Sequence, residues 1–300
     1  MMSGLFSAPA PEVTVALDGA AARLKQQIAE RAVPIYDCRE PISGSVTIAV
    51  KGRRFEYSEV RVELVGSLFV ANPEEMKEFL LISREVARAG AITQDSAFPF
   101  AFPRSEKPYE TYFGLTFRIR YTLRLTIVRP SGSNLAKDVE IWVQSVDLPP
   151  SFNPKIKLEA GLPDLIQLEL ELFATKFPLD GCIMGKVYFI SVQTRIVSME
   201  LSLLRRESVN VGVQTVKEHE ILGRFEVMDG QPVRSDSVPL RLFLAQFPCE
   251  STYRNVCGAA NVRYFLNLVV TDEEERKLYL RQEVELWRQQ LGPHPALSDM

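Results

Sequence analysis

The sequence is poor in histidine and lacks the motifs of the common enzyme classes. Only two of its 300 residues are histidine, His219 and His294, and the second lies in the polar tail. So few histidines leave almost no candidates for a histidine-based metal site or for a Ser–His–Asp triad. Phosphate-binding, dinucleotide-binding, zinc-protease and nucleophile-elbow motifs are also missing. These absences predict a protein that is not an enzyme and holds no metal or cofactor.

Long apolar runs, closely spaced cysteines and an excess of one charge are missing too. No segment reaches the roughly 18 apolar residues of a membrane span, and the N-terminus does not resemble a signal peptide. The formal net charge of −3 argues against a nucleic-acid partner. We therefore expect a cytoplasmic protein whose contact with any membrane is indirect. The cysteines, expected to be reduced structural thiols, form no CxxC pair: Cys38, Cys182, Cys249 and Cys257.

What the sequence does contain is alternation with a period of two residues. Between Arg118 and Ile127, apolar residues from Ile119 onward occupy every second position, and arginine or threonine occupies the others. The same pattern recurs in both halves of the chain. Such alternation is typical of antiparallel sheets with one packed face and one wet face. It predicts an all-β protein.

Residues 73–87 depart from this alternation. They begin with Pro73 and two acidic residues, which is typical of the start of a helix. The local pattern predicts a short helix, although a short apolar segment is ambiguous between helix and strand.

A proline-rich segment divides the chain near its midpoint. Residues 147–154 contain three prolines, which cannot donate to a sheet ladder. The sequence therefore predicts an N-terminal β-sandwich at residues 1–148, a linker at 149–154, a C-terminal β-sandwich at 155–288 and a flexible tail at 289–300.

The two predicted domains look like copies of one another. Gly44-Ser45-Val46 resembles Gly185-Lys186-Val187, and Asp95-Ser96 resembles Asp236-Ser237, both at an offset of 141 residues. The run RYTLRL at 120–125 resembles RYFLNL at 263–268, at an offset of 143 residues. Three matches in one order indicate a duplicated domain.

A few charged or apolar groups stand out as candidate contacts. The acidic run at 272–277 is best read as a solvated hairpin turn. The pairs Arg53-Arg54 and Arg205-Arg206 could contact an acidic surface, although such pairs are common. Val227 and Met228 run directly into an Asp-Gly turn, so they either project at a loop tip or simply end a buried strand. Any β-sandwich also has edge strands to which a partner strand can add.

Several long runs stand out along the chain: EKPYETY at 106–112, MDGQPVR at 228–234, VPLRLFLA at 238–245, VRYFLNLV at 262–269, DEEER at 272–276 and QEVELWR at 282–288. These runs resemble the vacuolar protein sorting-associated protein 26 family, the arrestin-like subunit of retromer. The similarity extends over nearly the whole chain in one order, which makes it far more specific than a single motif.

The resemblance implies an arrestin-like fold of two tandem β-sandwiches with a short polar interdomain core. It also implies extended structure, not a helix, at residues 73–87. The implied function is that of a non-catalytic subunit of an endosomal retromer coat, which recovers membrane cargo toward the Golgi or the cell surface. The protein would then be recruited from the cytoplasm to the endosomal membrane.

The resemblance further implies partners and site residues. Val227 and Met228 would contact the α-solenoid subunit of retromer, and a metallophosphoesterase-like subunit would join the same complex. Ala160 and Tyr279 would line a groove formed with a sorting nexin, where a cargo cytoplasmic tail adds as a strand. Ala160 is smaller than the residue expected there. The alternative is another arrestin-related adaptor, of a paralogous retromer-like complex or of the receptor-binding arrestins.

Overall fold

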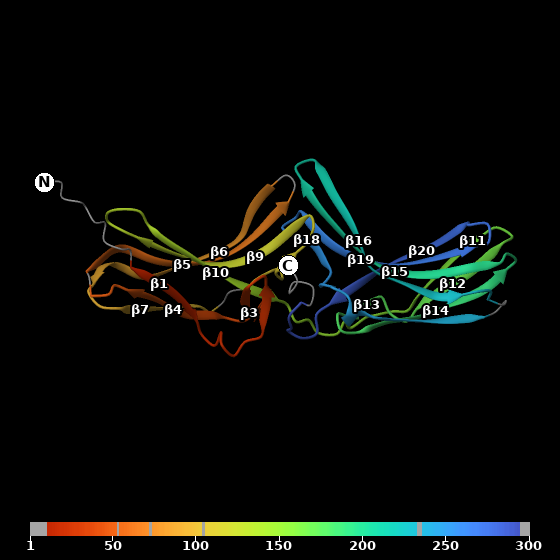
Figure 1. The fold of residues 1–300 in the computed structure, drawn as a ribbon, viewed down its shortest axis with the longest axis horizontal. Coiled ribbons are helices and arrows are strands. Elements are labelled where there is room, and N and C mark those ends of the chain that lie inside the picture. The colour runs from red at the N-terminus through yellow and green to blue at the C-terminus, as the bar shows by residue number, and fades with distance from the viewer. Residues whose placement is uncertain (1–10, 53, 72–73, 104–105, 233–235, 295–300) are drawn as a thin grey trace.

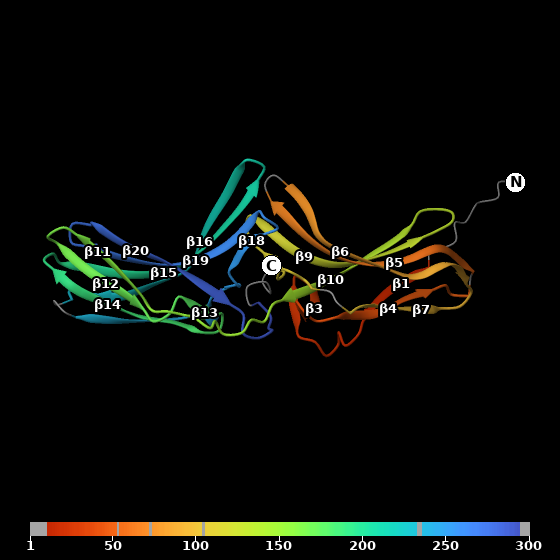
Figure 2. The same ribbon diagram turned by 180° about the vertical axis from the view of Figure 1, so that it is seen from behind.

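The computed structural model describes residues 11–294, except residues 53, 72–73, 104–105 and 233–235. Two β-sandwiches lie end to end in an elongated molecule, with the first half of the chain at one end and the second half at the other (Figure 1), as the view from behind also shows (Figure 2). The predicted all-β class and tandem arrangement are confirmed. None of the helical structure in these residues is long and apolar enough to cross a membrane.

The first half forms a three-stranded sheet in the order β1-β4-β7 and a larger sheet in the order β2-β3-β10-β9-β5-β6, with β8 paired to β9. Its strands are β1 (Glu12–Leu17), β2 (Lys25–Ile28), β3 (Arg31–Asp37), β4 (Ile42–Ala49), β5 (Phe55–Ala71), β6 (Glu74–Ile92), β7 (Ser96–Phe102), β8 (Tyr112–Phe113), β9 (Phe117–Val128) and β10 (Leu135–Gln144).

The second half forms a four-stranded sheet in the order β11-β12-β14-β17 and a larger sheet in the order β13-β20-β19-β15-β16, with β18 paired to β19. Its elements are β11 (Ile156–Leu162), β12 (Ile166–Leu172), β13 (Lys176–Pro178), β14 (Cys182–Val192), β15 (Ile196–Val211), β16 (Gln214–Asp229), β17 (Ser237–Phe243), the 3-10 turn η1 (Leu244–Gln246), β18 (Tyr253–Val256), β19 (Ala260–Asp272) and β20 (Lys277–Trp287).

The alternation read in the sequence corresponds to burial. Along β9 every second side chain, from Phe117 to Ile127, is buried, while the intervening ones are half-buried or exposed. No strand is assigned at residues 145–155, where the linker was predicted. The acidic run at 272–277 makes the turn between β19 and β20 as expected.

The helix predicted by the local pattern at residues 73–87 is wrong. Residues 74–92 form strand β6, which pairs with β5 along its whole length. Phe79 also packs edge-on against the rings of Tyr109 and Tyr121. The long ladder offered by β5 overrides the local helix signal, because tertiary pairing outweighs weak propensity. The extended structure implied by the family resemblance is confirmed.

The topology supports the duplication. Orders β1-β4-β7 and β12-β14-β17 correspond, as do β10-β9-β5-β6 and β20-β19-β15-β16. Gly44 on β4 and Gly185 on β14 occupy equivalent places. A Cβ atom at Gly44 would lie 2.2 Å from the Ala16 carbonyl oxygen, and one at Gly185 would lie 2.5 Å from that of Glu171. The matched glycines therefore mark the same close approach of two strands in each copy.

A buried polar cluster joins the two halves. Glu110 of the first half accepts hydrogen bonds from Ser251 Oγ at 2.9 Å, Tyr253 OH at 3.1 Å and Arg288 Nε at 3.1 Å. The Arg288 guanidinium also donates to Glu250 Oε2 at 2.6 Å. A buried carboxylate needs such partners to offset its lost hydration. This cluster matches the polar interdomain core that the resemblance implied.

A second buried carboxylate also joins the halves, but this one belongs to the second half and its hydrogen-bond donors belong to the first. Glu207 on β15 accepts hydrogen bonds from Tyr112 OH at 2.8 Å, from the Leu115 N–H at 3.1 Å and from the Thr116 N–H at 2.8 Å. The Thr116 hydroxyl adds another at 2.9 Å. The loop between β8 and β9 is therefore held by a side chain of the other half.

The first residues of the predicted tail are docked. The side chain of Gln144 donates to the Gly292 carbonyl oxygen at 2.7 Å and accepts from the Gly292 N–H at 3.0 Å. Gln26 makes the same two bonds with His294, at 3.2 Å and 2.6 Å. The expectation of a flexible tail from residue 289 therefore fails for Gly292 and His294. Two buried glutamine amides replace the missing strand partner of this backbone.

Removing Arg288 should expose the importance of the polar cluster. Arg288→Met removes the guanidinium that contacts both buried carboxylates, Glu110 and Glu250, and we expect a loss of about 3–5 kcal/mol in the free energy of unfolding. Glu110→Gln should cost less, about 1–2 kcal/mol, because Arg288 keeps Glu250. Urea unfolding of both single variants and the double variant measures this. If the loss in the double variant equals the sum of the losses in the two single variants, Arg288 and Glu110 are not energetically coupled, which would contradict this account of the cluster.

The Arg288→Met deficit should also depend on pH. Burial raises the pKa of Glu110, and the Arg288 charge opposes that rise. Without Arg288 the folded protein binds a proton more readily than the unfolded chain, so its stability increases as the pH falls. The deficit relative to the unmodified protein should therefore shrink between about pH 8 and about pH 5.5. A constant deficit in urea unfolding over that range would refute this.

Gln26→Ala combined with Gln144→Ala should release residues 292–294. Hydrogen–deuterium exchange at the Gly292 and His294 amides should increase by at least tenfold, because each loses its acceptor. Gln27→Ala is the matched control, since this neighbouring side chain is exposed and donates to the nearby Ala29 carbonyl oxygen, away from residues 292–294. Unchanged protection in the double variant would show that the two amides do not hold the tail.

Candidate protein-binding site

The second sandwich carries all four residues implicated by the resemblance. Val227 and Met228 lie near the end of β16, Ala160 lies on β11 and Tyr279 lies on β20. In the larger sheet β16 and β20 are separated by β15 and β19. Val227 and Met228 therefore lie at one side of this sheet and Tyr279 lies toward the other, while Ala160 lies on the outer strand of the smaller sheet, so the four residues do not form one site.

Val227 and Met228 belong to the end of a strand and not to a free loop tip. Met228 lies opposite Met199 in the ladder, and Val227 is the extra residue of a bulge between Met228 and Glu226. Both side chains are half-buried and pack against the hydrophobic core. Of the two alternatives that the sequence left open, the structure shows the strand end: the pair lies near the end of β16 with part of its apolar surface accessible.

Tyr279 lies on a strand edge that is only partly paired. β13 pairs with β20 only at Glu285, Leu286 and Trp287, so the first part of β20 has a ladder partner only on its β19 side among the described residues. Tyr279 points away from the core and is 59% exposed. An exposed aromatic side chain beside free backbone donors and acceptors is suited to adding a partner strand.

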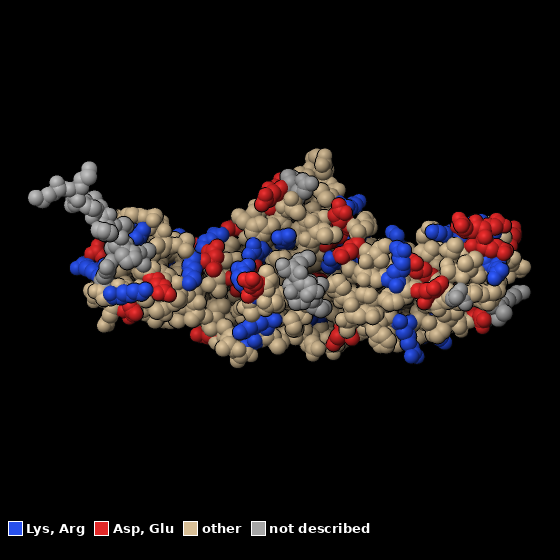
Figure 3. All heavy atoms as spheres, in the orientation of Figure 1, with Lys and Arg blue, Asp and Glu red and all other residues tan. Residues whose placement is uncertain are grey.

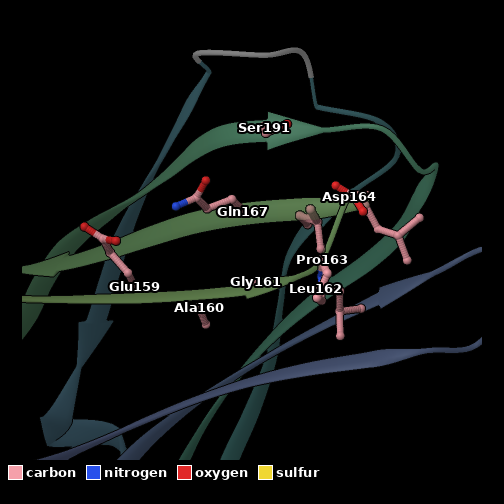
Figure 4. A pocket seen from close by; sticks show the side chains of 10 residues that line it. Glu159, Ala160, Gly161, Leu162, Pro163, Asp164, Gln167 and Ser191 are labelled. Carbon is pink, nitrogen blue, oxygen red and sulfur yellow. The ribbon is translucent and has the colours of Figure 1, made fainter.

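Ala160 lies on β11, the outer strand of the other sheet. Its methyl group points to the opposite side of the strand from Glu159, and it packs against the core (Figure 4). The Cα atoms of β11 and β20 approach within 8 Å, yet no ladder joins these strands. The two edges therefore face one another across a narrow seam. A shallow hollow of about 520 Å³ adjoins β11, and its lining includes Ala160 itself together with Glu159, Gly161 and Gln167.

The folded chain does not present the basic pairs of the sequence as two intact pairs of exposed arginines. Arg53 lies outside the described residues, and Arg54 pairs with Glu56. Arg205 is buried and faces Glu207, whereas Arg206 lies on the outer face of β15 over the ring of Phe265, 4.6 Å from its centroid. The sequence showed a basic pair, but only the strand register separates an inward arginine from an outward one.

Acidic and basic side chains are mixed over the visible face of the molecule, with acidic side chains gathered at the outer end of the second half (Figure 3). No broad basic face appears in this view. Within the described residues, no three His, Cys, Asp or Glu side chains are placed to hold a metal ion. The arrangement offers strand edges and partly covered apolar side chains, which are suited to protein contacts.

The family model for vacuolar protein sorting-associated protein 26 matches residues 12–275 of this chain. The Dictyostelium discoideum protein of that name is 42% identical over 257 residues, which cover 85% of this chain and 74% of the relative. The Plasmodium falciparum protein is 35% identical over 261 residues, covering 86% and 88%. Human vacuolar protein sorting-associated protein 26B is 38% identical over 252 residues, covering 83% and 75%. The chain therefore belongs to the vacuolar protein sorting-associated protein 26 family.

Proposed function

We propose that this chain is a non-catalytic subunit of an endosomal retromer coat. Its second sandwich docks on the α-solenoid subunit and, with a sorting nexin, receives cargo tails for retrieval to the Golgi or the cell surface. The metallophosphoesterase-like subunit belongs to the same complex. The protein is recruited from the cytoplasm, and its membrane contact is indirect. Family membership supports the sorting role, and the half-open edge of β20 is the observation that carries the binding mechanism.

Docking on the solenoid uses the accessible part of Val227 and Met228. Burying the remaining apolar surface of such side chains contributes up to roughly 1.5–3 kcal/mol each. The bulge at Val227 turns the end of β16 away from a regular ladder, which favours presentation of these side chains to a partner. The opposite edge of the same sheet stays free for cargo.

Cargo capture uses the seam between β11 and β20. A strand inserted between two others needs about 9.6 Å between its neighbours, twice the strand spacing. Because the Cα atoms of β11 and β20 approach within 8 Å, the seam has to widen before a tail enters. We infer that sorting nexin binding widens it and that the Tyr279 ring then covers an apolar side chain of the tail.

Val227→Asp combined with Met228→Asn should abolish binding to the solenoid subunit. The change places a charge and a polar amide where the interface buries apolar surface, and an unpaired buried charge is strongly unfavourable. Pull-downs with the retromer solenoid and with its paralogue measure binding and also identify the complex.

Val213→Asp is the matched control for this experiment, since Val213 lies fully exposed at the turn between β15 and β16. Because Val227 and Met228 are half-buried, the thermal unfolding midpoint of each variant has to be measured alongside. A folded double variant that binds the solenoid normally would refute the docking assignment.

Tyr279→Ala should weaken binding of a cargo-tail peptide in the presence of sorting nexin by at least tenfold, and leave solenoid binding unchanged. Loss of one aromatic contact exceeds the 1.4 kcal/mol that corresponds to tenfold. Phe243→Ala is the matched control, because Phe243 is 60% exposed on edge strand β17 of the opposite sheet. Equal losses in the two variants, measured by calorimetry, would contradict a specific groove at Tyr279.

A further inference from the structure

The outer face of the larger sheet in the second half carries an arginine-rich diagonal. Arg206 on β15 lies opposite Arg263 on β19, and two residues further along β19 comes Phe265. Two residues beyond that row, Arg281 on β20 lies opposite Asn267. Arg206, Phe265 and Arg281 therefore occupy successive rows on three neighbouring strands, and their side chains lie on the face turned away from the core.

Two arginines share the Phe265 ring. The Arg206 guanidinium lies 4.6 Å and that of Arg263 lies 5.6 Å from its centroid. Arg263 is occupied, because it forms an ion pair with Glu283. Among the described residues, neither Arg206 nor Arg281 forms an ion pair. Two guanidinium groups on this diagonal are thus available to an external anion.

The electrostatic setting of Arg206 favours an added anion. Its burial and the nearby charges of Arg263 and Arg281 lower the pKa of its guanidinium, and Glu283 opposes this only in part. The positive charges of Arg206, Arg263 and Arg281 are therefore not fully balanced by the nearby Glu283 carboxylate. An anion bound beside them would relieve the repulsion and form charge-assisted, bidentate hydrogen bonds.

We propose that Arg206, Phe265 and Arg281 bind an extended acidic peptide segment of a partner protein, with the pattern anion–x–apolar–x–anion. Alternate side chains of an extended peptide point to one face and repeat every ~6.6 Å. Each step of the diagonal crosses one strand and two residues, which is about 8 Å. The flexible arginine side chains span the small difference. The central apolar residue then covers Phe265 between the two anions.

Carboxylates on the same sheet face favour a narrow peptide over a lipid surface. Glu283 and Glu285 flank the diagonal on β20, and Glu200 lies opposite Glu226 on the other side. A flat anionic bilayer over this face would meet these carboxylates together with the arginines. A single extended chain lying along the diagonal places its anions over the arginines and only its apolar residue beside Glu283, which Arg263 already neutralises.

The test uses the full chain and a labelled synthetic peptide with phosphoserine at positions 1 and 5 and leucine at position 3 of the motif. Fluorescence anisotropy should show binding that Arg206→Gln with Arg281→Gln weakens at least tenfold. Arg281→Gln alone, at an exposed position, should weaken it about threefold. A second peptide with glutamate at positions 1 and 5 should bind more weakly, since phosphate carries more charge.

Two controls separate this site from general charge attraction. Arg241→Gln removes an exposed arginine from β17 on the opposite sheet and should leave binding unchanged. A peptide with phosphoserine at positions 2 and 4 keeps the charge but loses the spacing, and should bind at least fivefold more weakly. Equal binding of the two peptides, or an equal loss in Arg241→Gln, would overturn the proposal.

Vesicles containing phosphatidylserine provide the competing ligand. If the unmodified chain binds these vesicles through Arg206 and Arg281 but does not bind the peptide, the face is a lipid surface and the proposal fails. The site is independent of retromer assembly. Val227→Asp with Met228→Asn should retain peptide binding even where solenoid binding is lost, so the two proposals fail separately.

Discussion

The end-to-end arrangement of the two sandwiches depends on two buried carboxylates whose partners lie in the other half of the chain. Glu110 of the first half is held by Ser251, Tyr253 and Arg288 of the second, and Glu207 of the second is held by the loop at residues 114–116 of the first. Either carboxylate would be left buried without counter-groups if the halves separated. The interface therefore has a fixed geometry, whereas a purely apolar contact would tolerate sliding.

Duplication explains why these groups meet. Ser251 and Glu110, which are hydrogen-bonded, are 141 residues apart, the offset that relates the two copies in sequence. The rings of Tyr112 and Tyr253, also 141 residues apart, pack edge-on at 5.5 Å. Equivalent positions of the copies thus face one another, as they do across a two-fold dimer interface. Arg288, which contacts both Glu110 and Glu250, makes this interface asymmetric.

The parts of the fold set by local pattern were predictable, and the parts set by pairing at a distance were not. Alternation predicted β9, and the prolines predicted a linker at 149–154, which lies inside the strand-free segment at 145–155. The local pattern at residues 73–87 predicts a helix where β6 forms. The reason is that β6 is fixed by its pairing with β5, and a short stretch of sequence does not contain that partner. Gln26 and Gln144 gave no signal, since their role is to bind the backbone of residues 292–294. Likewise, the outward direction of Arg206 follows only from its register.

The two copies also differ at the edge where a strand could add. In the first copy, Lys137 lies on the part of β10 that β3 does not pair, and it donates to the Val13 carbonyl oxygen of β1 at 2.7 Å. This bond ties one sheet to the other. Lys137 lies opposite Leu125, whose counterpart Leu268 lies opposite Leu280. Leu280 is buried and apolar, so it cannot make the corresponding polar tie. The second copy also has an additional outer strand, β11, since β1 of the first copy corresponds to β12. The copies therefore differ both in the strand that faces this edge and in the lysine contact that fixes it, and in the second copy the edge carries Tyr279.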